Sequence, residues 1–134
     1  DGEAVNDLVS PYPAAPWRAG IVPDSAGYLK LTPAAYQAFF AKGLPREQAA
    51  VLATSQGPAS QSVLLGKITN AAWKTKPSYW ALSDSDQMIP AALQQAEAAR
   101  MKAKLTTIKG GGHAEMLSHP KEIAEVILDA AARL

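Results

Sequence analysis

The chain has 134 residues, enough for one ordinary domain with a sizeable core. Its 13 lysine and arginine residues stand against 12 acidic residues, and the resulting net charge of +1 provides no basic stripe for nucleic acid. The sequence contains no cysteine, which excludes disulfides and thiolate metal sites, and no apolar run near the roughly 20 residues of a membrane helix. We therefore expect an ordered globular chain with neither nucleic acid nor a membrane as its partner.

Residues 1–28 are rich in proline, glycine and alanine and show little periodicity. This composition predicts an extended connecting loop. The sequence begins at Asp1 rather than at a methionine, so we expect that a signal peptide or a whole preceding segment has been removed from it.

Residues 29–72 contain three helical signals in succession. The first helix, over 33–43, starts with a proline behind the N-cap Thr32 and ends at a glycine. The second covers 45–54 and the third 60–65, with a Gly-Pro pair between them. Three short helices between a loop and the first good strand predict a helical cap or lid laid over a site.

The pattern changes in residues 73–134, where short apolar runs alternate with helical segments. We expect strands at 79–82 and 105–108, a helix over 90–102 between them, and a last helix from Pro120. Strand, helix, strand and helix at this spacing predict a parallel pair with a right-handed crossover. Parallel strands are normally buried on both faces, so two strands alone make an incomplete sheet. The missing strands must come from another chain or a second copy.

Two polar residues follow the predicted strands and carry the chemistry. Asp86 comes after the first strand, and His113 comes after the second, behind three glycines. The 27 positions between them accommodate one helix and one strand, so both side chains should emerge at the carboxyl edge of the sheet. An aspartate there can orient the imidazole while the histidine shuttles a proton. The pair forms half of a catalytic triad, and no nucleophile is obvious in the sequence.

Other residues compete for these roles. Asp86 could be a simple turn residue, and Asp84 is the nearest alternative acid, although capping or support suits it better. His119 directly precedes the last helix and fits a surface or capping position. Residues 53–57 read Ala-Thr-Ser-Gln-Gly, an Ala-x-Ser-x-Gly variant of the nucleophile elbow. An elbow serine follows a buried strand, whereas Ser55 follows a helical segment, so we favour a helix C-terminal turn for it.

Two further patterns have plainer explanations than ligand binding. Gly110–Gly112 lacks the spacing and the following Lys-Ser/Thr of a phosphate loop, and we favour a turn that needs positive φ and close backbone approach. The set His113, Glu115 and His119 matches no standard zinc spacing, so we expect no metal. Packing is also the favoured role for the three tryptophans, Trp17, Trp73 and Trp80.

Four short segments stand out in the second half of the chain: Asp-Gln-Met-Ile-Pro at 86–90, Ala-Arg-Met at 99–101, Gly-His at 112–113 and Met-Leu-Ser-His-Pro at 116–120. Taken together they resemble the C-terminal part of bacterial α/β-hydrolases. Residues 1–8 are similar to the stretch after that family's sixth sheet strand, and 29–67 are similar to its cap. The family carries its triad in the order nucleophile, acid, histidine, and the acid and histidine fall on Asp86 and His113.

The resemblance implies an α/β fold that is the C-terminal portion of an α/β-hydrolase. Residues 1–28 would form an extended connecting loop, and residues 29–72 would form the helical cap. Residues 73–134 would supply the strand, helix, strand and helix of the C-terminal part of the core. The sheet would be incomplete without an N-terminal half, which in the family carries the early strands, the oxyanion loop and the Gly-x-Ser-x-Gly elbow.

The resemblance also implies hydrolysis of a small ester or related acyl substrate through a covalent acyl-enzyme. A serine from the absent half would attack, His113 would act as general acid and base, and Asp86 would orient it. No cofactor is needed, and the expected partners are the N-terminal half, or a second copy of this chain, and a small-molecule ester. The chain alone should be inactive.

The cap would shape an apolar substrate pocket. The candidate lining residues are Tyr36, Phe39, Phe40 and Leu44. The resemblance suits a soluble protein of the bacterial cytoplasm or periplasm. The alternative is a non-catalytic binding or assembly module of α/β-hydrolase-like fold whose acid and histidine are idle.

Overall fold

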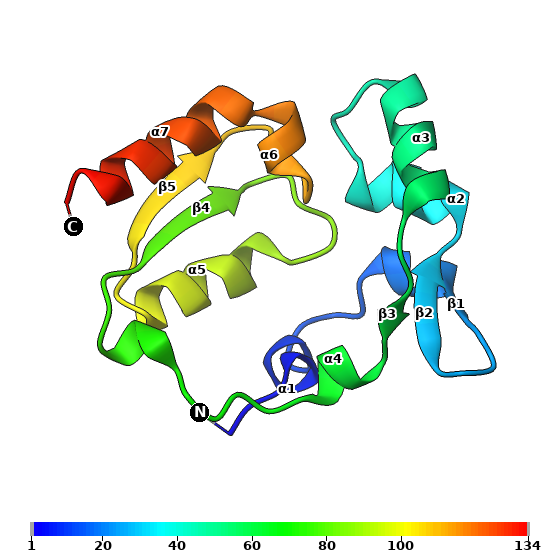
Figure 1. Ribbon diagram of the computed structural model, residues 1–134, viewed down its shortest axis with the longest axis horizontal. Coiled ribbons are helices and arrows are strands. Elements are labelled where there is room, and N and C mark those ends of the chain that lie inside the picture. The colour runs from blue at the N-terminus through cyan, green and yellow to red at the C-terminus, as the bar shows by residue number, and fades with distance from the viewer. Residues whose placement is uncertain (1, 134) are drawn as a thin grey trace.

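The computed structural model describes residues 2–133 and has two parts that lie side by side (Figure 1). One part is a pair of parallel strands packed between helices. The other is a small antiparallel sheet with short helices around it. None of the helices in residues 2–133 is long and apolar enough to cross a membrane.

The parallel part confirms the predicted order of strand, helix, strand and helix. Its elements are β4 (Tyr79–Ser83), α5 (Ala91–Arg100), β5 (Lys104–Ile108), α6 (Glu115–Ser118) and α7 (Pro120–Ala131). The strands pair in parallel, with Tyr79 opposite Lys104 and Ser83 opposite Ile108. Figure 1 shows α5 and α7 on opposite sides of the pair. Prolines mark both long helices, because Pro90 is the N-cap of α5 and Pro120 is the first residue of α7.

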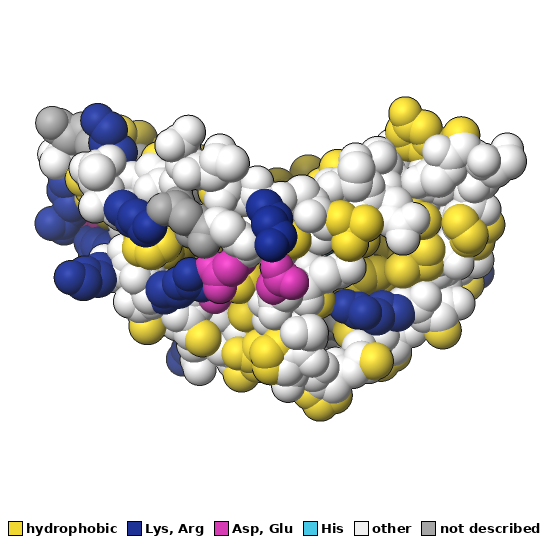
Figure 2. Space-filling model, turned by 90° about the horizontal axis from the view of Figure 1, so that it is seen from below, with side chains coloured by type: hydrophobic (Ala, Val, Ile, Leu, Met, Phe, Trp, Pro, Cys, Tyr) yellow, Lys and Arg dark blue, Asp and Glu magenta, His cyan; other side chains and the backbone are white. Residues whose placement is uncertain are grey.

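This sheet has only two strands within the described residues. Leu82 and Ile108 are buried at its carboxyl end, while Leu105 is 43% exposed. The long helix α7 has no buried residue, and its Ile127 and Leu128 are 61% and 67% exposed. Apolar side chains of this part are therefore incompletely covered. Figure 2 shows further hydrophobic side chains at the surface of the face seen from below.

The prediction of an extended loop over residues 1–28 is wrong for the part that the structure describes. That segment contains α1 (Val5–Val9), the 3₁₀ helix η1 (Pro16–Gly20) and β1 (Ile21–Pro23), which pairs with β2 (Tyr28–Leu31) in a hairpin. The Asp24 carboxylate accepts hydrogen bonds from the backbone N–H groups of Ala26 and Tyr28, and Gly27 has φ +80°. Such an Asp turn needs no long apolar run, and so the hairpin was missed.

The cap contains the expected helices but is not purely helical. A short strand, β3 (Ala59–Ser60), joins the hairpin and makes a three-stranded antiparallel sheet in the order β1-β2-β3. The helices are α2 (Pro33–Ala35), the π-helix η2 (Tyr36–Phe40), α3 (Arg46–Ser55), α4 (Ser62–Leu65) and the 3₁₀ helix η3 (Ala72–Lys74). The expected N-cap is confirmed, because Thr32 Oγ1 accepts the N–H of Ala35 at 3.2 Å.

A small core holds the cap together. Tyr36, Ala41, Ala49 and Ala53 are buried in one cluster, with Leu31, Phe40, Leu44 and Leu52 packed against it. The small alanine side chains let α3 approach η2 closely. The Tyr36 and Phe40 rings stack with their centroids 4.6 Å apart. The core therefore fixes the positions of these two aromatic rings.

Candidate active site

Asp86 and His113 meet as the sequence predicts. Asp86 lies in the loop after β4, His113 lies in the loop after β5, and Oδ2 of Asp86 is 3.1 Å from Nδ1 of His113. The Asp86 side chain is 5% exposed and the His113 side chain 26%. The carboxylate is thus buried in the protein, while part of the imidazole is exposed.

The Asp86 carboxylate is an acceptor of several hydrogen bonds. Oδ1 accepts the backbone N–H groups of Met88 at 2.7 Å and Ile89 at 3.2 Å, and Oδ2 also accepts Nε2–H of Gln94 at 3.2 Å. Burial by itself raises the pKa of the Asp86 carboxyl. Hydrogen bonds from His113 and the two backbone groups outweigh burial, so the pKa lies below its usual range. Because an ionised carboxylate only accepts, Nδ1 of His113 carries the hydrogen between them.

The glycine loop before His113 is held by Asp84 and by close packing. Oδ1 of Asp84 accepts the N–H of Gly110 at 2.7 Å, and Gly110 has φ +74°. A Cβ on Gly112 would lie 2.5 Å from the backbone oxygen of Lys42 in the cap. The plain explanation for these glycines, positive φ and close approach, is confirmed. Asp84 contacts this loop, whereas Asp86 contacts the imidazole.

A second carboxyl lies beside the pair. The Ser83 hydroxyl, at the end of β4, donates a hydrogen bond to Glu115 at the start of α6. Burial raises the pKa of Glu115, and the charge of Asp86 raises it further. Sequence reasoning weighed Glu115 only as a metal ligand and missed this contact. The signal in the sequence was Ser83, a polar residue at the end of an otherwise apolar strand.

The remaining polar candidates, His119 and Ser55, lie at helix ends and form local hydrogen bonds. His119 occupies the N-cap position of α7, and its Nδ1 is 2.8 Å from the Ser118 hydroxyl. Ser55 is the exposed last residue of α3, and its hydroxyl donates to the carbonyl of Leu52 at 3.3 Å. The predicted helix C-terminal turn is therefore confirmed for Ser55. Among the residues that the structure describes, no three His, Asp or Glu side chains form a group that could hold a metal ion.

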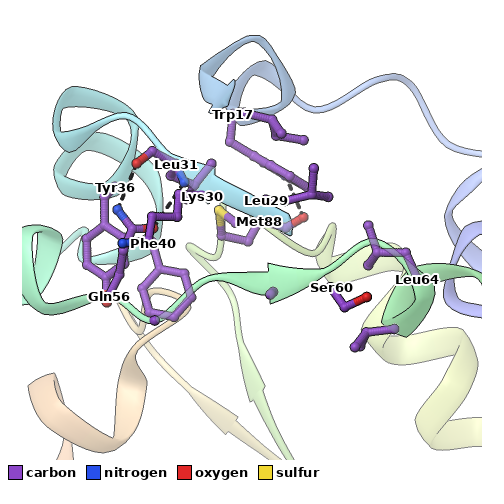
Figure 3. A pocket seen from close by; sticks show the side chains of 14 residues that line it. Trp17, Leu29, Lys30, Leu31, Tyr36, Phe40, Gln56, Ser60, Leu64 and Met88 are labelled. Atoms are coloured by element: carbon purple, nitrogen blue, oxygen red, sulfur yellow. Dashed lines mark hydrogen bonds between the residues drawn. The ribbon is translucent and has the colours of Figure 1, made fainter. Parts of the chain in front are cut away.

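An apolar cavity of about 370 Å³ lies between the cap and the acid loop (Figure 3). Its lining includes Tyr36 and Phe40, as expected, together with Trp17 and Met88. Phe39 and Leu44 are not among the described residues that line it. Leu44 packs against the cap core instead.

Trp17 and Met88 were not predicted as pocket residues. They come from distant parts of the chain and are joined because Trp17 Nε1–H donates to the Met88 carbonyl at 3.0 Å, a bond drawn in Figure 3. Figure 3 also shows Gln56 beside Leu31, where its side chain accepts the Leu31 N–H at 3.0 Å and donates to the Leu31 carbonyl at 2.7 Å. These bonds fix opposite walls of the cavity.

A neighbouring cavity of about 400 Å³ reaches the imidazole, because His113 is among its lining residues. The two cavities share Trp17, Ile21, Leu29, Leu64 and Met88. The Phe40 ring meets the His113 ring edge-on, with centroids 4.7 Å apart. An apolar space thus extends from the cap to the histidine of the Asp-His pair.

A buried aspartate and a partly exposed histidine at the carboxyl ends of neighbouring parallel strands are typical of α/β hydrolytic sites. The model of the Alpha/beta hydrolase family matches residues 2–126, and the chain belongs to this family. The resemblance found in the sequence is confirmed.

The individual relatives are esterases. Over 53 residues the chain is 43% identical to pimeloyl-[acyl-carrier protein] methyl ester esterase of Xanthomonas campestris pv. campestris (strain B100), covering 39% of this chain and 21% of that protein. Over 63 residues it is 38% identical to the protein of the same name from Xylella fastidiosa (strain M12), covering 45% and 25%. The chain therefore spans about a quarter or less of these curated relatives.

Solved structures show the same fold. Polyneuridine aldehyde esterase superposes with a TM-score of 0.76 at 16% sequence identity, over 96% of this chain and 56% of that chain. At this identity the likeness establishes the fold alone. The chain covers about half of that solved chain.

Proposed function

We propose that this chain supplies the acid and the histidine of a serine esterase, with Asp86 as the acid and His113 as the general acid and base. The observation that carries the proposal is the 3.1 Å contact between Oδ2 of Asp86 and Nδ1 of His113. The carboxylate is buried and accepts from several donors, so it is well placed to orient the imidazole and to stabilise its protonated form. The curated relatives, which are methyl ester esterases, support this activity.

The chemistry assigned to His113 uses its second ring nitrogen. Nδ1 is engaged by Asp86, which leaves Nε2 to take the proton of an attacking serine hydroxyl. The serine oxygen then bonds to the ester carbonyl carbon, and His113 passes its proton to the departing alcohol. Water hydrolyses the acyl-enzyme by the reverse roles, releasing the acid and the free serine. This sequence of steps requires no metal or cofactor.

The nucleophile is proposed to come from an N-terminal half. Ser55 is hydrogen-bonded in a helix end and lies in neither cavity's lining, so we do not assign it. Within the described residues β4 and β5 pair only with each other, and each leaves one edge of backbone donors and acceptors. A complement that adds strands there would complete the sheet and bring a serine to the open side of His113.

The proposed substrate is a small ester with an apolar part. The cavity of about 370 Å³ is walled mainly by aromatic and aliphatic side chains, including Trp17, Tyr36 and Phe40, and it adjoins the cavity that reaches His113. Such walls favour a hydrocarbon portion of the acyl or alcohol group.

Co-expression with a complementary polypeptide of about 100 residues, carrying strands and a Gly-x-Ser-x-Gly turn, tests the proposal. The assembly should hydrolyse short p-nitrophenyl esters, and a fluorophosphonate probe should label the complement. A stable assembly without hydrolysis or labelling would favour the non-catalytic binding module. Self-association of this chain without the complement would favour a second copy as its partner.

A further inference from the structure

A buried glutamine on α5 contacts the acid of the Asp-His pair. Gln94 is 5% exposed, although it lies in a helix of mostly exposed polar and small alanine residues. Its Nε2 donates to Oδ2 of Asp86 at 3.2 Å and to the Ile89 carbonyl at 3.0 Å, and its Oε1 accepts the Ser83 N–H at 3.3 Å.

These partners fix the orientation of the Gln94 amide. The backbone N–H of Ser83 can only donate, so it selects the oxygen of the amide. The nitrogen must then face the two acceptors, the Ile89 carbonyl and the Asp86 carboxylate. One side chain thus joins the end of β4, the acid loop and the acid itself.

The oxygen that Gln94 contacts is the one that faces the histidine. Oδ2 of Asp86 receives both Nε2–H of Gln94 and Nδ1–H of His113, whereas Oδ1 receives two backbone groups. The other charged group near the acid is Glu115, whose interaction with Asp86 is repulsive. Among the residues that the structure describes, Gln94 is therefore the one side chain besides His113 that hydrogen-bonds the Asp86 carboxylate.

We propose that Gln94 is a positioning residue that acts on His113 through Asp86, by holding Oδ2 in place and stabilising its ionised form. The inference rests on the proposed function of the pair. It predicts that the hydrogen-bonding capacity of Gln94, and not only its volume, contributes to the acidity of Asp86 and to the alignment of the imidazole.

Two variants of similar size separate these roles in the assembly of this chain with its N-terminal complement. Gln94→Leu keeps a side chain of similar volume but removes the Nε2–H donor. Gln94→Glu keeps the shape but brings a carboxyl against two acceptors, the Ile89 carbonyl and Oδ2 of Asp86. Gln95→Leu and Gln95→Glu make the same changes on the next residue of α5, which is exposed, and serve as matched controls.

The first readout is titration of Asp86 by ¹³C NMR of the carboxyl carbon, which needs no activity. Loss of one hydrogen bond to the charged oxygen should weaken Asp86 as an acid by about tenfold in Gln94→Leu. Gln94→Glu should weaken it more, through the added negative charge. The Gln95 variants should titrate as the wild type does. An Asp86 titration unchanged in both Gln94 variants would overturn the inference.

The second readout is ester hydrolysis. Gln94→Leu should lower kcat by about tenfold or more with KM within about twofold, because a misaligned base slows chemistry more than binding. In Gln94→Glu the acid limb of the pH profile of kcat/KM should move to higher pH, because the added negative charge favours the protonated imidazole. Loss of activity without this pH change would reduce Gln94 to a packing residue and contradict the inference.

The outcomes also separate this inference from the proposed function. If the wild-type assembly is inactive but Asp86 titration responds to Gln94, the proposed function fails while the electrostatic coupling stands. If the assembly is active and loses activity in His113→Ala but both readouts ignore Gln94, only the present inference fails.

Discussion

Replacing Asp86 by asparagine tests the geometry of the Asp-His pair more sharply than deletion does, because the shape is kept and one acceptor becomes a donor. The backbone N–H groups of Met88 and Ile89 point at Oδ1. The amide oxygen of the asparagine must stay on that side, since an NH₂ group there would face two donors. The amide nitrogen then takes the place of Oδ2.

The consequence falls on the histidine. Nδ1 of His113 is 3.1 Å from the Oδ2 position and would meet an N–H donor in place of a carboxylate oxygen. The imidazole can keep this hydrogen bond only by accepting at Nδ1, which places its hydrogen on Nε2. That tautomer cannot take the proton of a serine. In a Ser-His-Asp triad such a change lowers kcat by about 10⁴-fold, or about 5 kcal/mol in the activation free energy.

The assay is steady-state hydrolysis of p-nitrophenyl acetate and butyrate by the assembly with its N-terminal complement. Asp86→Asn should lower kcat by about 10³- to 10⁴-fold, with KM changed much less. Asp84→Asn is the matched control. Oδ1 of Asp84 accepts from the Gly110 N–H and the Ser85 hydroxyl, and an asparagine oxygen can accept both. Its kcat should stay within a few fold. A collapse in Asp84→Asn with an active Asp86→Asn would refute the assignment.

Three further predictions concern the nucleophile, the second carboxyl and assembly. Ser55→Ala should leave turnover of the assembly within a few fold, and fluorophosphonate labelling of this chain at Ser55 would contradict our choice. The pKa of Glu115 is raised in the fold, so its contribution favours folding below the ordinary value, 4.5, and is lost as pH rises through the folded pKa. Glu115→Gln removes that loss, so thermal unfolding from pH 4 to 8 should show the variant gaining stability relative to wild type as pH rises, and a constant difference would refute this. The chain alone, whose described residues leave two strand edges unpaired and apolar side chains of α7 exposed, should be oligomeric, aggregated or partly molten. Light scattering that shows a monodisperse 14.1 kDa monomer with a sharp unfolding transition would contradict the fragment interpretation.

The parallel part could be predicted because its signals are local. The run before Asp86 is apolar and aromatic, Pro90 and Pro120 mark helix starts, and the observed bounds differ from the expected ones by a residue or two. The spacing of two strand ends then brought the acid and the histidine together. These are patterns of period and position, which a sequence displays directly.

The hairpin and the pocket could not be predicted in the same way. Strands β1 and β2 have three and four residues, too few to show a period, and the turn between them depends on side-chain contacts of Asp24. Trp17 and Met88 are 71 positions apart and meet only through the fold. Gln94 looks like an ordinary polar helix residue until α5 is packed against β4.

Removal of the imidazole tests the central claim most directly. The wild-type assembly and His113→Ala, each with the N-terminal complement, should be compared for hydrolysis of p-nitrophenyl butyrate under saturating substrate. If His113 is the general acid and base oriented by Asp86, kcat of the variant should fall by several orders of magnitude while the assembly stays intact by light scattering. An intact His113→Ala assembly with full turnover would contradict the account.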